Sequence, residues 1–146
     1  MIYFASDHAG YALKQELMAF LKSNGFDTHD AGTYNSTDSC NYAEYGKSAA
    51  QMVAGNTDSL GVLICGTGAG ISMAAGKVTG IRCACVSEPV TARLMREHNN
   101  ANMISLGARI VGFELAKEIV TAFITTPFSQ DQRHKARIAT IEPTLS

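Results

Sequence analysis

The apolar run Leu60–Cys65 and the glycine-rich turn after it constrain the fold of this chain more than any other feature. An uninterrupted apolar run of this length predicts a strand that is buried on both faces. Sheets are covered on both faces when helices pack on either side of parallel strands. The sequence GTGAG at Gly66–Gly70 then predicts a tight passage from this strand into a helix.

The rest of the chain repeats this alternation of short apolar runs with helical patterns, which predicts one α/β domain over residues 1–146. The predicted strands are residues 2–6, 26–30, 60–65, 81–86 and 103–106. The predicted helices are residues 11–22, 43–54, 71–77, 87–97 and 114–125, with a last helix from a capping box at 129–132. In the helix over 114–125 we expect Leu115, Ile119, Val120 and Phe123 to face the core.

Composition excludes several classes of protein. The 146 residues are 46% hydrophobic and carry a formal net charge of −1, which argues against a general binder of nucleic acid or membrane surfaces. An anionic ligand would therefore need a focused site. No apolar run approaches the roughly 18 residues of a membrane helix, and the N-terminus lacks an export signal. The four cysteines have no metal-type spacing, so we predict reduced thiols in a cytoplasmic protein.

Polar residues follow the predicted strands at the edge where parallel sheets bind ligands. Asp7 and His8 follow the first strand, Cys65 and the glycine turn follow the central one, and Ser87-Glu88 follows the next. We expect these groups to face one crevice.

The glycine turn has the spacing GxGxG, which satisfies neither the dinucleotide fingerprint nor the Walker A loop. We favour a cradle for an anion or oxyanion over a turn that binds nothing. Cys65, at the mouth of this turn, is either a small core residue or an activated thiol. Cys83 and Cys85 are two residues apart and are predicted to lie in the core.

Two further polar segments leave alternatives open. The run from His98 to Asn102 is either a capped helix end or a source of an imidazole and amide donors. Arg133 and Arg137 share one side of the last helix, either as a solvated face or as a phosphate clamp, with Arg109 as a third candidate.

Taken together, five motifs resemble the type B ribose-5-phosphate isomerase family, which includes subunits of galactose-6-phosphate isomerase and allose-6-phosphate isomerases. They cover almost the whole chain in order and at matching spacing. The motifs are SDHAG at 6–10, ICGTGAGIS at 64–72, SEP at 87–89, REHNNAN at 96–102 and RHKAR at 133–137.

The resemblance implies a single Rossmann-like, three-layer α/β domain with a mostly parallel sheet, assembled as a homodimer or a dimer of dimers whose active sites are shared between chains. It implies a metal-independent enzyme without a cofactor that interconverts ribose 5-phosphate and ribulose 5-phosphate through a cis-enediolate. The alternatives are isomerisation of a six-carbon sugar phosphate, such as allose 6-phosphate or galactose 6-phosphate, and a non-catalytic phosphosugar-binding module. The presence of both Cys65 and His98 argues against one subunit of a split galactose-6-phosphate enzyme.

The resemblance also implies roles for individual residues. Cys65 would be the base that moves the proton between C2 and C1, and Thr67 would help to move the proton between the two oxygens. His98, assisted by Asp7, would open the furanose ring, and Tyr42 would line the sugar pocket. The residues that would hold the enediolate are Gly66, Gly68, Gly70, Ser72 and Asn99. The residues that would bind the phosphate are His8, Arg109, Arg133 and Arg137.

The chain departs from the family pattern at two places. It has Asn41-Tyr42-Ala43 where members commonly have Asp-Tyr-Pro, and Asp131-Gln132 where a Gly-Gly pair is frequent. These departures leave the exact substrate open. A second subfamily uses a glutamate just after the glycine turn, and Ile71 at that position favours the cysteine version.

Overall fold

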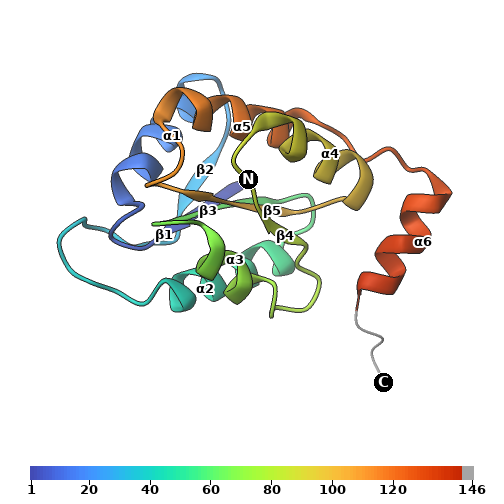
Figure 1. The fold of residues 1–146 in the computed structure, drawn as a ribbon, viewed down its shortest axis with the longest axis horizontal. Coiled ribbons are helices and arrows are strands. Elements are labelled where there is room, and N and C mark those ends of the chain that lie inside the picture. Colours follow the sequence, from blue (N-terminus) through green and yellow to red (C-terminus); the bar gives the residue numbers. More distant parts are fainter. Residues whose placement is uncertain (143–146) are drawn as a thin grey trace.

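The computed structural model describes residues 1–142, in which strands and helices alternate along the chain (Figure 1). The strands are β1 (Ile2–Ser6), β2 (Thr28–Asp30), β3 (Leu60–Cys65), β4 (Cys83–Cys85) and β5 (Met103–Gly107). The helices are α1 (Tyr11–Ser23), α2 (Tyr42–Gly55), α3 (Ala69–Ala75), α4 (Pro89–Asn99), α5 (Phe113–Thr125) and α6 (Gln132–Ile141).

All five strands are parallel and lie in the order β2-β1-β3-β5-β4. The apolar strand β3 is central, with β1 and β5 on its two sides, and its last five residues are buried, as the sequence predicts. The chain is therefore an α/β fold with a fully parallel sheet, and the carboxyl ends of β1, β3 and β5 meet at one edge.

Helices cover both faces of the sheet (Figure 1). Helices α1, α4 and α5 pack on one face, over a core that includes Phe4, Leu17 and Phe123. Helices α2 and α3 pack on the other face, over a core that includes Leu63 and Ile71. Helix α6 stands outside these layers and packs on α4 (Figure 1).

Three predictions for individual side chains are wrong. Leu115 is 40% exposed, because its position on α5 turns away from the sheet. The last helix is capped by Asp131, whose carboxylate accepts from the Arg133 N–H at 2.9 Å, and not by Ser129. The thiol of Cys85 is exposed, because the edge strand β4 is covered less than the central strands.

A buried lysine fixes the carboxyl end of β2. Lys14 is fully buried, and its Nζ donates to Asp30 Oδ1 and to the Thr33 carbonyl, at 2.5 Å each. Burial lowers the pKa of this amine, whereas the hydrogen bond and charge of Asp30 oppose that shift. The amine thereby ties α1 to the segment that leads from β2 toward α2.

Within residues 1–142, no helix has both the length and the apolar character that crossing a bilayer requires.

Candidate active site

The first group of candidate residues surrounds the turn between β3 and α3. Cys65 ends β3 and is buried, and its Sγ accepts a hydrogen bond from the Gly68 N–H at 3.1 Å. A donor of this kind interacts more strongly with a sulfur that carries negative charge. The turn therefore holds the thiol in a fixed position and offers a donor to a thiolate.

Gly68 is the residue that makes this turn possible. Its φ is +82°, and a Cβ added to it would lie 2.8 Å from both Cys85 Sγ and the Leu106 carbonyl carbon. The Ser105 hydroxyl donates to the Gly68 carbonyl at 2.7 Å and anchors the turn to β5. Only glycine satisfies both the left-handed backbone and this close packing.

Side chains from neighbouring elements border the same turn. A Cβ added to Gly66 would lie 2.9 Å from Arg109 Nη1, and one added to Gly70 would lie 2.6 Å from the Tyr42 ring. The Arg109 guanidinium and the Tyr42 ring therefore lie against the two ends of the glycine run. The structure brings both predicted residues to Cys65's edge of the sheet.

Asp7 and His8 reach this edge from the end of β1. Asp7 is buried, and its Oδ1 accepts from the Gly10 N–H at 3.0 Å, which fixes the carboxylate at the start of α1. The Nδ1 atom of His8 is buried and has no hydrogen-bond partner among residues 1–142. A buried polar atom without a partner is rare in a folded protein, which makes His8 a candidate for a ligand-binding role.

Thr67 and Ser72 complete the first group. Thr67 is exposed, and its Oγ1 accepts from the Ala69 N–H at 3.3 Å. Ser72 lies one turn into α3. Burial raises the pKa of the Cys83 thiol to about 12, although the Ser72 side chain opposes this shift. Cys83 is therefore a neutral thiol near neutral pH.

The second group lies at the opposite edge of the same sheet. His98 and Asn99 end α4, and the chain then turns through Asn100, in the left-handed conformation, to the amino end of β5. Met103 pairs with Gly61, four residues before Cys65 along β3, which corresponds to about 13 Å along the strand. The structure therefore does not bring His98 and Asn99 to Cys65 of the same chain.

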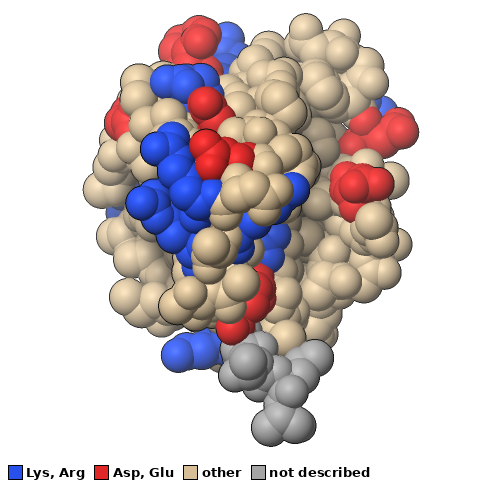
Figure 2. Space-filling model, turned by 90° about the vertical axis from the view of Figure 1, so that its right-hand side faces the viewer, with Lys and Arg blue, Asp and Glu red and all other residues tan. Residues whose placement is uncertain are grey.

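Helix α6 belongs to this second group. Its exposed basic residues are Arg133, Lys135 and Arg137, and Figure 2 shows a concentration of basic side chains on the face that carries this helix. The focused positive charge contrasts with the net charge of −1. Arg133 and Arg137 are both exposed, and Arg133 Nε pairs with Asp131 Oδ2 at 3.2 Å.

His134 connects α6 to His98, a role that sequence reasoning missed. The two imidazole rings lie 4.5 Å apart between centroids, and His134 Nδ1 bonds the Ser129 hydroxyl at 3.0 Å. Burial lowers the pKa of His134. The charges of His98, Arg133 and Arg137 act in the same direction, and that of Asp131 opposes them. The neutral ring therefore packs against His98 at neutral pH.

Similarity to known proteins extends over nearly all of the chain. The sequence profile of the Ribose/Galactose Isomerase family matches residues 2–141. Ribose-5-phosphate isomerase B of Escherichia coli strain K12 is 44% identical over 140 residues, which cover 96% of this chain and 93% of that protein.

Solved structures agree with this similarity. The ribose 5-phosphate isomerase of Thermotoga maritima superposes with a TM-score of 0.92 at 42% identity, covering 97% of this chain and 96% of that one. Ribose-5-phosphate isomerase B of Mycoplasma genitalium, with bound ribulose-5-phosphate, superposes with a TM-score of 0.91 at 39% identity, covering 96% of this chain and 92% of that one.

Proposed function

Because the chain belongs to the ribose/galactose isomerase family, we propose that it interconverts ribose 5-phosphate and ribulose 5-phosphate, with Cys65 as the base. One observation carries the proposal for Cys65. Its buried Sγ is held at 3.1 Å from the Gly68 N–H, inside a glycine turn that Arg109 borders, and the Asp7 N–H donates to the Ile64 carbonyl just before Cys65 at 3.2 Å. The activity itself is supported by relatives named ribose-5-phosphate isomerase B, at 44% identity in one case.

The proposed reaction moves one proton between two carbons. The Cys65 thiolate removes the proton from C2 of the open-chain aldose, which leaves a cis-enediolate, and the same proton is then delivered to C1. Meanwhile the hydroxyl proton on O2 moves to O1, with Thr67 as the relay. The net reaction is an isomerisation in which the carbonyl moves from C1 to C2 and no atom or electron is gained or lost.

Stabilisation of the enediolate has to accompany proton removal, because the carbon acid is weak. The first N–H groups of a helix have no acceptor within the helix, so the amides of Gly70 and Ile71 in the first turn of α3 are suited to a negative oxygen. Gly66, Gly68 and the Ser72 hydroxyl would complete this cradle. The Tyr42 ring against Gly70 would border the sugar.

The remaining roles need a second copy of the chain. His98 and Asn99 lie at the amino edge of the sheet, whereas Cys65 lies at the carboxyl edge. We therefore assign ring opening by His98, with Asp7, and the Asn99 contact to a site shared between two copies. Arg133 and Arg137 of one copy would bind the phosphate together with His8 and Arg109 of the other.

An isomerase assay tests the activity directly. Purified protein should convert ribose 5-phosphate to ribulose 5-phosphate, with a higher kcat/KM than for allose 6-phosphate or galactose 6-phosphate, and EDTA should not change the rate. Ketose formation is followed by absorbance or by NMR. A chain that binds sugar phosphates without converting any of them would be the non-catalytic binding module, and preference for a six-carbon sugar would reassign the substrate.

Replacing Arg137 by alanine should raise KM for ribose 5-phosphate by about 10- to 100-fold with little change in kcat, because a charged hydrogen bond to the phosphate is lost. Lys135→Ala is the matched control, since Lys135 is an exposed cation on the same helix. Initial-rate kinetics give kcat and KM for both variants. Equal KM values for the two variants would reject the phosphate clamp.

A further inference from the structure

Arg82 lies just before β4 and contacts the ends of two helices. Its Nε donates to the carbonyls of Asn99 and Asn100 at 3.1 Å each, and its Nη2 donates to the Asn100 carbonyl at 2.8 Å. Its Nη1 forms an ion pair with Glu142, which caps the end of α6. One guanidinium therefore joins the last turn of α4 to the end of α6.

The Arg82 guanidinium is well suited to joining the ends of α4 and α6. The last carbonyls of a helix carry partial negative charge, so a guanidinium there satisfies acceptors that the helix leaves open. The Arg82 side chain is only 17% exposed, which strengthens its interactions relative to those of a solvated arginine. The guanidinium is planar and rigid, so it also fixes the direction of its partners.

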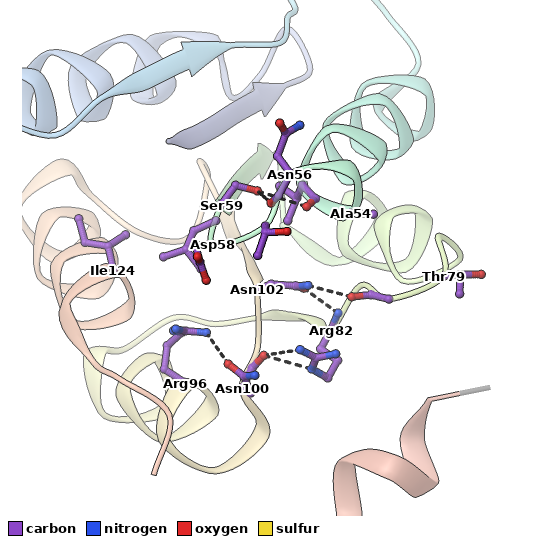
Figure 3. A pocket seen from close by; sticks show the side chains of 14 residues that line it. Ala54, Asn56, Asp58, Ser59, Thr79, Arg82, Arg96, Asn100, Asn102 and Ile124 are labelled. Carbon is purple, nitrogen blue, oxygen red and sulfur yellow. Dashed lines mark hydrogen bonds between the residues drawn. The ribbon is translucent and has the colours of Figure 1, made fainter. Parts of the chain in front are cut away.

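Neighbouring residues hold Arg82 and the turn after α4 in place. Asn102 Oδ1 accepts from the Arg82 backbone N–H at 2.9 Å, and Asn102 Nδ2 donates to the Gly80 carbonyl at 2.8 Å. Arg96 Nη1 donates to the Ala101 carbonyl at 2.6 Å. Figure 3 shows these side chains around a cavity of about 490 Å³ at the amino edge of the sheet.

Helix α6 has few other connections to the rest of the chain. The His134 ring packs on His98, and Ser129, just before α6, donates its N–H to the Glu97 carbonyl at 3.0 Å, so both contacts are with α4. Within residues 1–142, the Arg82–Glu142 pair is the one salt bridge between the α6 segment and another part of the chain. It therefore ties the end of α6 to the approach to β4, where Ile141 also lines a pocket with Ile81 and Cys83.

We propose that Arg82 is a positioning residue that sets the His98–Asn99 end of α4 and the Arg133–Arg137 face of α6 relative to each other. The inference rests on the proposed function, in which both elements reach the same shared site. Arg82 itself touches no substrate. It acts through the carbonyls of Asn99 and Asn100 and through Glu142, so it should affect ring opening and phosphate binding together.

Three variants separate these effects. Arg82→Ala should lower kcat for ribose 5-phosphate about tenfold or more and also raise KM, because both elements lose their alignment. Glu142→Gln should raise KM severalfold with kcat nearly unchanged, because it releases only α6. Arg93→Ala removes an exposed arginine of α4 that pairs with Glu97, and should change neither constant. If Arg82→Ala does not fold, Arg82→Lys serves instead, since lysine keeps the charge but not the rigid fork.

Two measurements exclude a purely structural role and a wrong function. All kinetics are done well below the midpoint of thermal unfolding of each variant, and the Kd for inorganic phosphate is measured by calorimetry. Phosphate binding weakened about tenfold in Arg82→Ala but unchanged in Arg93→Ala supports the inference. Unaltered kcat, KM and phosphate Kd in a folded Arg82 variant overturns it. A wild-type chain that binds phosphate but does not convert ribose 5-phosphate refutes the proposed function instead. In that case the phosphate Kd of Arg82→Ala, compared with that of Arg93→Ala, still tests the role of Arg82.

Discussion

Replacing Cys65 by alanine should lower kcat for ribose 5-phosphate by about 10³-fold, since a positioned acid–base group contributes on this scale. Binding should persist, because the phosphate contacts are made by other side chains. The fold should also persist, because the substitution removes one sulfur atom from the end of a strand whose backbone bonds remain. Initial rates and a competition measurement with inorganic phosphate give kcat and binding separately.

Cys40→Ala is the matched control for this experiment. Cys40 is a partly exposed free thiol in the segment before α2, so its removal tests for general effects of losing a thiol. The control should retain wild-type kcat. Wild-type turnover in folded Cys65→Ala would show that another group moves the proton.

Mixing two inactive variants should restore activity if the site is shared between copies. Cys65→Ala lacks the base at the carboxyl edge, and His98→Asn lacks the imidazole at the amino edge. A dimer with one chain of each kind has one site with both wild-type residues and one site with neither. The purified mixed dimer should therefore have about half of the wild-type activity per dimer.

The measurement needs a purified mixed dimer and a control for complementation. Equimolar variants are co-expressed with different tags, and the doubly tagged species is purified and assayed. A mixture of Cys65→Ala with Arg109→Ala is the control, because both positions lie at the same edge and cannot complement in a mixed dimer. Failure of the first pair to recover activity in a verified mixed dimer would place the whole site within one chain.

Much of the fold could be predicted from the sequence, because the pattern of β3 is easy to recognise. Its continuous apolar run is the pattern of a strand between two helical layers, and the structure confirms it as the central strand. The edge strand β4 was harder to predict. It covers only Cys83–Cys85 instead of 81–86. An edge strand pairs with one neighbour only, so fewer hydrogen bonds stabilise its ends and less of its surface is buried.

The candidate site was partly predictable for a similar reason. Residues that follow parallel strands share one edge, and this rule correctly brought Asp7, Cys65 and the glycine turn together. The same geometry puts a residue that ends a returning helix, such as His98, at the other edge. Arg82 carried no signal in the sequence, because its partners are backbone carbonyls and a glutamate 60 positions away.

The buried amine of Lys14 has a consequence for chemical footprinting. Of the six lysines in the chain, this one is fully buried and held by Asp30 and Thr33. An acylating reagent can reach its nitrogen only after α1 separates from the end of β2. The rate at which Lys14 is labelled therefore reports how often that corner of the molecule opens, and the segment it anchors leads to Tyr42 beside the glycine turn.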